Sequence, residues 1–175
     1  VPYGSRSKDT LIKYSRQDIN FLKSFDIKVP VAACGTVSSV ALPLIKGDYD
    51  IPIIGVVESS SKVAVSCTKN NRIGVIGTAG TINSNAFNKE ITSLLPHAEV
   101  FSRSCPLFVP LVENGRFIRG DSVIETVARE YLEFFADKNI DTLVLGCTHY
   151  PLLTDIISDI MPSVALINSG YCAAA

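Results

Sequence analysis

The 175-residue chain lacks the features that mark several large classes of protein. No apolar run approaches the roughly 20 residues of a membrane-spanning helix, so we expect no membrane partner. The chain has 16 basic and 17 acidic residues, and its net charge of −1 leaves no basic stripe for nucleic acid and no acidic tail. A Gly-Lys-Ser/Thr phosphate loop and a serine nucleophile elbow are also missing. The composition therefore gives no indication of a membrane or nucleic-acid partner.

Paired cysteines are missing too. The five cysteines are an odd number without Cys-x-x-Cys spacing, which disfavours a disulfide framework or a metal site and fits a reducing cytoplasm. We interpret Cys67 and Cys172 as small buried hydrophobes. Gly74-x-x-Gly77-x-x-Gly80 is not a dinucleotide fingerprint, so no dinucleotide cofactor is expected, and tight strand–helix packing explains these glycines.

What the chain has in quantity is apolar sequence, at 47% of its residues, enough for one full domain or two small ones. Short apolar runs alternate with segments of helical periodicity, which predicts parallel sheet and an α/β fold. The apolar runs lie at 28–33, 51–57, 72–77, 98–102, 142–145 and 164–167. The predicted helices lie at 9–24, 37–45, 83–95, 121–137 and 152–160, and 105–110 is predicted as a loop.

A thiol, a hydroxyl and an imidazole follow the strand predicted at 142–145. Cys147, Thr148 and His149 occupy the turn, and Pro151 suits the first turn of the next helix. Ligands bind at such strand ends in open α/β sheets, and a helix N-terminus favours a thiolate or a carboxylate. His149 is either a capping imidazole or the proton partner of the thiol, and the neighbouring Cys147 favours the second interpretation.

A second stretch has the same order of strand, cysteine, threonine and helix. Cys34, Gly35 and Thr36 follow the apolar run 29–33 and precede the helix predicted at 37–45. Two such units can face each other across a cleft, each offering one thiol.

Several segments together resemble the glutamate racemases of the aspartate/glutamate racemase family. In family order they are Val1–Arg6, Cys34-x-Thr36, Gly74–Thr78 with Thr81–Ile82, Cys105–Glu113 and Leu145–Leu152. The resemblance implies two parallel-sheet α/β domains related by a pseudo-twofold axis, with the active site in the cleft between them. We place the first domain at 1–69, resuming near 168–175, and the second at 70–167.

The resemblance also implies an activity, which is the cofactor-independent interconversion of L- and D-glutamate that supplies peptidoglycan synthesis. It implies glutamate as the small-molecule substrate, a homodimer, a cytoplasmic location and no metal. Cys34 and Cys147 are the implied bases, with His149 holding or shuttling the proton of Cys147. The implied substrate contacts are Tyr3, Gly4, Gly35, Thr36, Thr148 and His149.

Two thiols suit racemisation, because one thiolate can remove the Cα proton while the opposite thiol donates one. No lysine lies in a motif for pyridoxal phosphate. Hydrogen bonds must therefore stabilise the carboxylate as it gains enolate character, and Thr36, Thr148 and backbone N–H groups are placed for that.

The sequence also departs from the family pattern. A strand and loop carrying an Asp-Ser pair would precede Val1, and a C-terminal helix would continue past Ala175. Gly35 stands where the family usually has Asn, Asn168 where it has Asp, and Ser59-Ser60 where it has Pro-Gly. Two alternatives therefore stay open: a racemase for another acidic amino acid such as aspartate, and a catalytically impaired homologue that only binds an amino acid or a protein partner. We expect Gly35→Asn to add a substrate hydrogen bond and raise kcat/KM.

Overall fold

The computed structural model describes residues 3–174 and contains two parallel sheets. The first pairs two short strands, β1 (Val31–Ala32) and β2 (Ile54–Gly55). The second has the order β4-β3-β5-β6, with strands β3 (Arg72–Gly77), β4 (Glu99–Ser104), β5 (Thr142–Leu145) and β6 (Ala165–Asn168). All strand pairings in the four-stranded sheet are parallel. The predicted α/β class with parallel sheets is confirmed.

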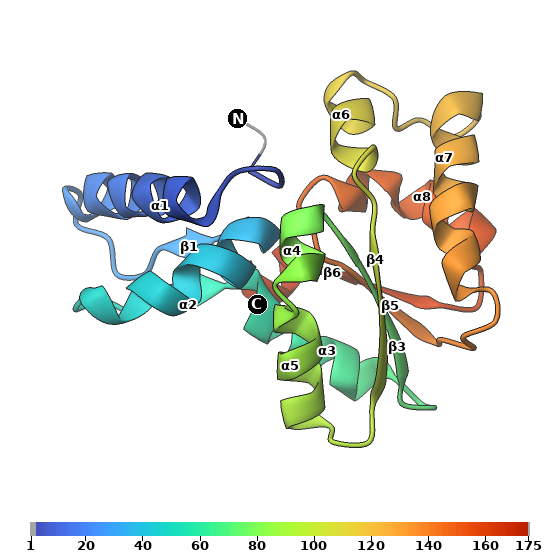
Figure 1. Ribbon diagram of the computed structural model, residues 1–175, viewed down its shortest axis with the longest axis horizontal. Coiled ribbons are helices and arrows are strands. Elements are labelled where there is room, and N and C mark those ends of the chain that lie inside the picture. The colour runs from blue at the N-terminus through green and yellow to red at the C-terminus, as the bar shows by residue number, and fades with distance from the viewer. Residues whose placement is uncertain (1–2, 175) are drawn as a thin grey trace.

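Helices cover both faces of the four-stranded sheet (Figure 1). On one face α7 (Ser122–Leu132) and α8 (Thr154–Ile160) enclose a core that includes Leu143 and Leu145. On the other face α3 (Val56–Cys67) and α5 (Ala86–Leu94) pack over side chains that include Val144. Coverage on both faces explains why β3 and β5 read as continuous apolar runs rather than as alternating ones.

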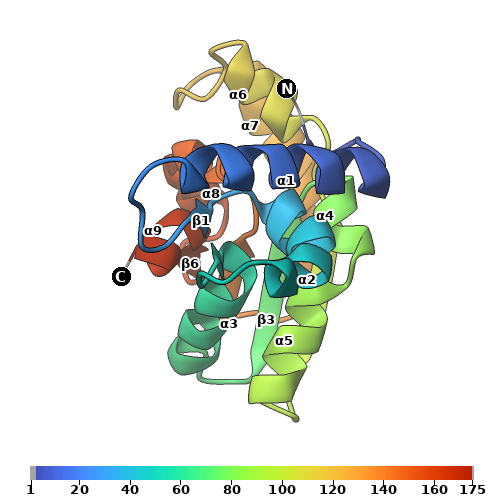
Figure 2. The ribbon, with the colours of Figure 1, turned by 90° about the vertical axis from the view of Figure 1, so that its left-hand side faces the viewer.

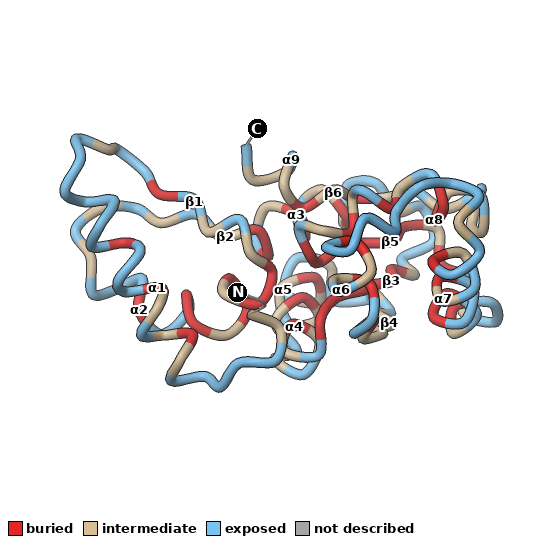
Figure 3. The backbone as a smooth tube through the Cα atoms, turned by 90° about the horizontal axis from the view of Figure 1, so that it is seen from above, coloured by how far each residue is buried: buried red, intermediate tan, exposed pale blue. Residues whose placement is uncertain are grey.

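The smaller part of the molecule consists of the β1–β2 sheet with α1 (Lys8–Lys23) and α2 (Leu42–Ile45), seen face on in Figure 2. Ser7 caps α1 by accepting a hydrogen bond from the N–H of Thr10 at 3.3 Å. A π-helical turn, Val37–Ala41, precedes α2. Figure 3 shows buried stretches gathered around the larger sheet and longer exposed runs in this smaller part.

The predicted division at residue 69 separates two segments that pack together. Helix α3 belongs to the range 1–69, yet its residues Val57 and Ala64 share a core with Ile73 and Val75 of β3. The last helix, α9 (Ser169–Ala174), also packs against α3. The domain boundary stays a prediction, but the packing of α3 joins it to the four-stranded sheet.

Two other segments differ from the sequence prediction. The helix predicted at 83–95 is present as α5 but begins later, at Ala86, and a separate helix, α4 (Ala79–Asn83), precedes it because Asn85 between them has a left-handed φ of 58°. The predicted loop at 105–110 runs into a helix, α6 (Phe108–Glu113). Pro110 is tolerated there because it lies in the first turn, where its missing N–H costs no helical hydrogen bond.

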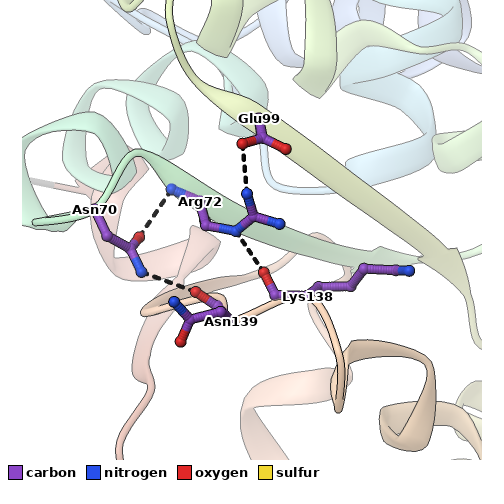
Figure 4. A network of polar contacts seen from close by, with 5 residues as sticks. All are labelled: Asn70, Arg72, Glu99, Lys138 and Asn139. Atoms are coloured by element: carbon purple, nitrogen blue, oxygen red, sulfur yellow. Dashed lines mark hydrogen bonds and ion pairs between the residues drawn. The ribbon is translucent and has the colours of Figure 1, made fainter.

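Polar contacts hold the loops at the edge where the strands of the larger sheet begin (Figure 4). The Arg72 guanidinium pairs with Glu99 and donates from Nε to the Lys138 carbonyl at 2.6 Å. Beside it, the Asp141 carboxylate accepts hydrogen bonds from Thr68 Oγ1, the Lys69 and Asn70 N–H groups and Thr142 Oγ1. The cavity described below lies at the opposite end of these strands. Among the described residues, no helix has the length and apolar character needed to cross a membrane.

Candidate active site

A cavity of about 970 Å³ opens where the strands end, between the smaller part of the molecule and the larger sheet. Both predicted cysteine turns reach it, one after β1 and one after β5, together with the loop before α1. The predicted site residues that line it are Tyr3, Gly4, Cys34, Thr36, Cys147, Thr148 and His149. The structure therefore brings seven of the eight predicted site residues to one cavity, and Gly35 is the one that does not line it.

The Cys147 thiol is nearly enclosed, with 7% of the residue exposed. Burial raises the pKa of Cys147 to about 11, although hydrogen bonding from the backbone of His149 lowers it; the charges of Cys34 and Glu113 add to the increase. A thiol of this kind is protonated at neutral pH, so it needs a proton acceptor before it can act as a base.

His149 supplies such an acceptor. Its Nδ1 lies 3.7 Å from Cys147 Sγ, and its Nε2 lies 3.2 Å from Glu113 Oε1. An ionised carboxylate can only accept, so Nε2 carries the proton and Nδ1 of the neutral ring is free to accept from the thiol. The three side chains form a relay in which Glu113 contacts Nε2 of the imidazole and Nδ1 faces the Cys147 thiol.

Glu113 is a residue of the cavity that the sequence did not single out as a site residue. Its place as the last residue of the family-like segment 105–113 was the only signal that pointed further. Helix α6 carries the carboxylate to the cavity, where it meets a residue 36 positions away in the chain. No local pattern could have paired the two.

Three threonine hydroxyls form a buried cluster at the cavity wall. Thr36 Oγ1 lies 2.9 Å from Thr78 Oγ1, which lies 3.1 Å from Thr81 Oγ1. Thr78 also caps α4 by accepting from the N–H of Thr81 at 3.3 Å. The sequence singled out Thr36 but gave Thr78 and Thr81 only a place at the start of a helix. The cluster links the first cysteine turn to the end of β3.

The loop before α1 is held against the start of α4. The Gly80 N–H donates to the Gly4 carbonyl at 3.2 Å, and a Cβ added at Gly4 would lie 2.7 Å from Thr78 Cβ. This close approach requires a residue without a side chain. The Tyr3 ring packs edge-on against Tyr14, and burial, followed by the charges of Asp18 and Cys34, raises the pKa of the Tyr3 phenol.

Cys34 lies in a more open setting and is half-buried. Its carbonyl accepts from the Ser38 N–H at 2.9 Å, and the Ser38 hydroxyl donates to the Ala32 carbonyl at 2.8 Å. Ser38 thus contacts the backbone on both sides of the cysteine. Within residues 3–174 we find no hydrogen-bond partner for the Cys34 thiol itself.

Gly35 faces the second cysteine turn instead of the cavity. A Cβ built on it would lie 1.9 Å from the Gly146 carbonyl oxygen. This geometry reverses the direction predicted for Gly35→Asn, because the space that an asparagine side chain must enter is filled by backbone.

The remaining cysteines differ from one another. Cys67 is exposed, which corrects its interpretation as a buried hydrophobe, because it lies at the solvent-facing end of α3. Cys172 is half-buried against the core beneath α3. Cys105 is fully buried, and burial raises the pKa of its thiol to about 12. In the described part of the chain, no three His, Cys, Asp or Glu side chains gather as a metal ion requires.

Comparison with known proteins identifies relatives along nearly the whole chain. The family model described as Asp/Glu/Hydantoin racemase matches residues 4–175. A glutamate racemase of Persephonella marina is 46% identical over 174 residues, which are 99% of this chain and 66% of that protein. The chain thus spans slightly less than two thirds of the length of this curated relative.

Comparison with solved structures also identifies glutamate racemases. A glutamate racemase isoform from Bacillus anthracis superposes with a TM-score of 0.94 at 36% identity, covering 99% of this chain and 65% of that one. A glutamate racemase from Francisella tularensis, solved in complex with D-glutamate, superposes with a TM-score of 0.89 at 39% identity, again covering 99% and 65%.

Proposed function

Since the chain belongs to the Asp/Glu/hydantoin racemase family, we propose that it interconverts L- and D-glutamate without a cofactor and supplies D-glutamate for peptidoglycan. One observation carries this proposal: thiols from two strand–turn–helix units line one cavity, and one of them contacts a histidine–glutamate relay. The curated relative is a glutamate racemase, and one structural neighbour holds D-glutamate, which supports glutamate as the substrate.

In the proposed reaction Cys147 passes its proton to His149 Nδ1 as its sulfur removes the proton from Cα. The electron pair of the broken C–H bond moves into the substrate carboxylate, which gains enolate character. The Cys34 thiol then donates its proton to the opposite face of Cα, which inverts the centre and leaves Cys34 as the thiolate. The reverse reaction exchanges the roles of the two sulfurs, and proton exchange with solvent returns the pair to its starting state.

The developing charge requires stabilisation, because enzymes lower barriers by about 8–23 kcal/mol relative to the uncatalysed reaction. Hydroxyl and backbone N–H donors at the wall of the cavity can provide part of it. We assign this role to Thr36 and Thr148, as predicted, and add Thr78, whose hydroxyl lies 2.9 Å from that of Thr36. Tyr3 and Gly4 complete the wall beside Cys34.

Hydrogen exchange at Cα tests the proposal directly. The chain is incubated in heavy water with L-glutamate, D-glutamate, L-aspartate or no amino acid. NMR then follows deuterium at Cα, and circular dichroism follows the conversion of one enantiomer into the other. We expect D-glutamate formed from L-glutamate to carry deuterium from the first turnovers, while unreacted L-glutamate stays protiated.

Three results would contradict parts of the proposal. Early label in the unreacted enantiomer would indicate a single exchanging base. Faster conversion of aspartate than of glutamate would indicate the other acidic substrate. Binding of glutamate without any exchange at Cα would indicate a homologue that only binds. A homodimer, also implied by the family, is measured by analytical ultracentrifugation in the same buffer.

A further inference from the structure

The two cysteine turns meet backbone to backbone. Gly35 directly follows Cys34, and Gly146 directly precedes Cys147. A Cβ on Gly35 would lie 1.9 Å from the Gly146 carbonyl oxygen and 3.0 Å from its carbon. Cβ atoms essentially never lie closer than 3.0 Å to another heavy atom, so the two turns must separate by more than one ångström to admit any side chain at position 35.

The second turn is the more firmly held of the two. The Gly146 N–H donates to the Ile76 carbonyl of β3 at 2.8 Å, and the Leu145 carbonyl accepts from the buried Ser169 hydroxyl at 2.8 Å. Gly146 therefore continues the hydrogen bonding of a four-stranded sheet. A retreat of its carbonyl would break main-chain hydrogen bonds inside the core, which is costly because buried backbone groups are left unpaired.

The first turn is attached to less structure. It follows a strand of two residues, β1, and its other ties are the Ser38 contacts and the hydroxyl cluster of Thr36. A side chain at position 35 would therefore displace the Cys34 turn rather than the Cys147 turn. Cys34 would move with it, because the two residues share a peptide bond.

We propose that Gly35 is a positioning residue that sets the separation of the Cys34 and Cys147 thiols by allowing this backbone contact. Its importance for turnover rests on the proposed racemase function, but the contact itself does not. A misplacement of about 1 Å in a reacting group can lower a rate by about 10²-fold. The substitution should therefore lower kcat far more than it changes KM.

The test compares Gly35→Ala with Gly47→Ala as a matched control. Gly47 also lies in the smaller part of the molecule, and a Cβ there meets no atom within 4 Å. Both variants carry Cys67→Ala and Cys172→Ala, so that only Cys34 and Cys147 are accessible to reagent. Bifunctional thiol reagents of graded length are applied at alkaline pH, and peptide mapping by mass spectrometry measures the Cys34–Cys147 cross-link.

We expect Gly35→Ala to shift the preferred reagent to a longer one, while alkylation of Cys34 alone stays unchanged. Gly47→Ala should keep the reagent preference of the parent chain. In the racemisation assay Gly35→Ala should lose about 10²-fold in kcat. An unchanged reagent preference in folded Gly35→Ala would overturn the proposal. A shifted preference in a chain that racemises nothing would instead count against the proposed function alone.

A second variant covers the case in which Gly35→Ala does not fold, as judged by circular dichroism. Ser38→Ala keeps both glycines but removes the hydroxyl that contacts the Ala32 carbonyl and the Val56 N–H. If the glycine contact sets the spacing, Ser38→Ala should keep the reagent preference of the parent. A shift to longer reagents in Ser38→Ala would assign the spacing to the serine and overturn the proposal.

Discussion

The two cysteine turns share a sequence pattern but not an environment. Cys147 follows β5, an inner strand of the four-stranded sheet, is 7% exposed and contacts His149. Cys34 follows a two-residue strand of a two-stranded sheet and is half-buried. The same order of strand, thiol and helix therefore gives a deeply enclosed thiol in one place and a more open one in the other.

The difference shows that the surrounding sheet, rather than the motif, determines how each thiol is prepared. Covered on both faces, the larger sheet excludes water from Cys147 and so disfavours its thiolate. In the proposed reaction the relay of His149 and Glu113 offsets that cost, because His149 Nδ1 lies 3.7 Å from Cys147 Sγ. The Cys34 turn is more open. This difference between the two thiols can be tested by changing each of them and their neighbours.

The largest effect is expected from removing either thiol. Cys34→Ala and Cys147→Ala should each lower racemisation by about 10²–10⁴-fold, because each removes one acid–base partner. The measurement is deuterium at Cα from each enantiomer of glutamate in heavy water. Cys172→Ala is the control and should retain activity. If either site variant keeps near-full turnover, the assignment of two bases is wrong.

Removing the relay should affect Cys147 and leave Cys34 unchanged. Glu113→Gln and His149→Gln each remove a charge-assisted contact worth roughly 1.5–3 kcal/mol, which corresponds to about one to two decades in rate. Because L- and D-glutamate are equally stable, kcat/KM must fall by the same factor in both directions, so the specific readout is alkylation, which should change at Cys147 and stay unchanged at Cys34. Glu58→Gln, which loses only an exposed pair with Lys62, is the control. An equal change in alkylation at both thiols would show that the relay is not specific to Cys147.

The burial of Cys147 predicts a pH dependence of alkylation. Its pKa is raised to about 11, so the reactive thiolate is scarce at neutral pH and increases as pH rises towards that value. We expect the rate of iodoacetamide labelling at Cys147 to rise through this range, and labelling of the more open Cys34 to come first. A plateau in Cys147 labelling near neutral pH would mean that the thiol is already ionised.

The smallest effect is expected at the end of the larger sheet where its strands begin. Asp141→Asn should lower the free energy of unfolding by about 1–3 kcal/mol, because an amide cannot accept all four hydrogen bonds of the carboxylate. Chemical denaturation measures the difference, and Asp137→Asn is an exposed control. Alkylation of both cysteines should stay unchanged, because Asp141 lies at the opposite end of β5.

The pH dependence of that difference has a definite sign. Burial raises the pKa of Asp141, but hydrogen bonds from Thr68, Lys69, Asn70 and Thr142 outweigh it and lower the pKa overall. The stabilisation is therefore complete above the unfolded value of about 3.9 and is lost as pH falls through the lower folded pKa. The gap between parent and variant should be full at pH 7 and close in acid. A gap that widens on acidification would contradict the contacts described.

The parts of the fold that were predictable are those with a strong local signal. β3 and β5 match their predicted bounds because strands covered on both faces are continuously apolar. The break at Asn85 depends on one left-handed residue, and α6 on a proline placed in a first turn, so neither appears in an apolar pattern. Within residues 3–174, β1 pairs with β2 alone and extends over two residues.

The sequence predicted the thiols and hydroxyls that line the cavity, but not the contacts between residues far apart in the chain. Cys147 and His149 are two residues apart, so a single turn brings them together. Glu113 and Thr78 arrive from other elements, and only the tertiary structure places them. Gly35 is the clearest case, since its sequence neighbours predict a missing substrate contact, whereas its spatial neighbour is a carbonyl oxygen.

The meeting of the two glycines has a consequence for how such sequences can diverge. Gly146 has no side chain to lose, so no substitution there can make room for a larger residue at position 35. Compensation has to come from the path of the main chain, for example through an insertion or deletion in one of the two turns. A relative with asparagine at the position of Gly35 should therefore hold its two turns farther apart, and lengths of the turns, rather than pairs of residues, should covary across the family.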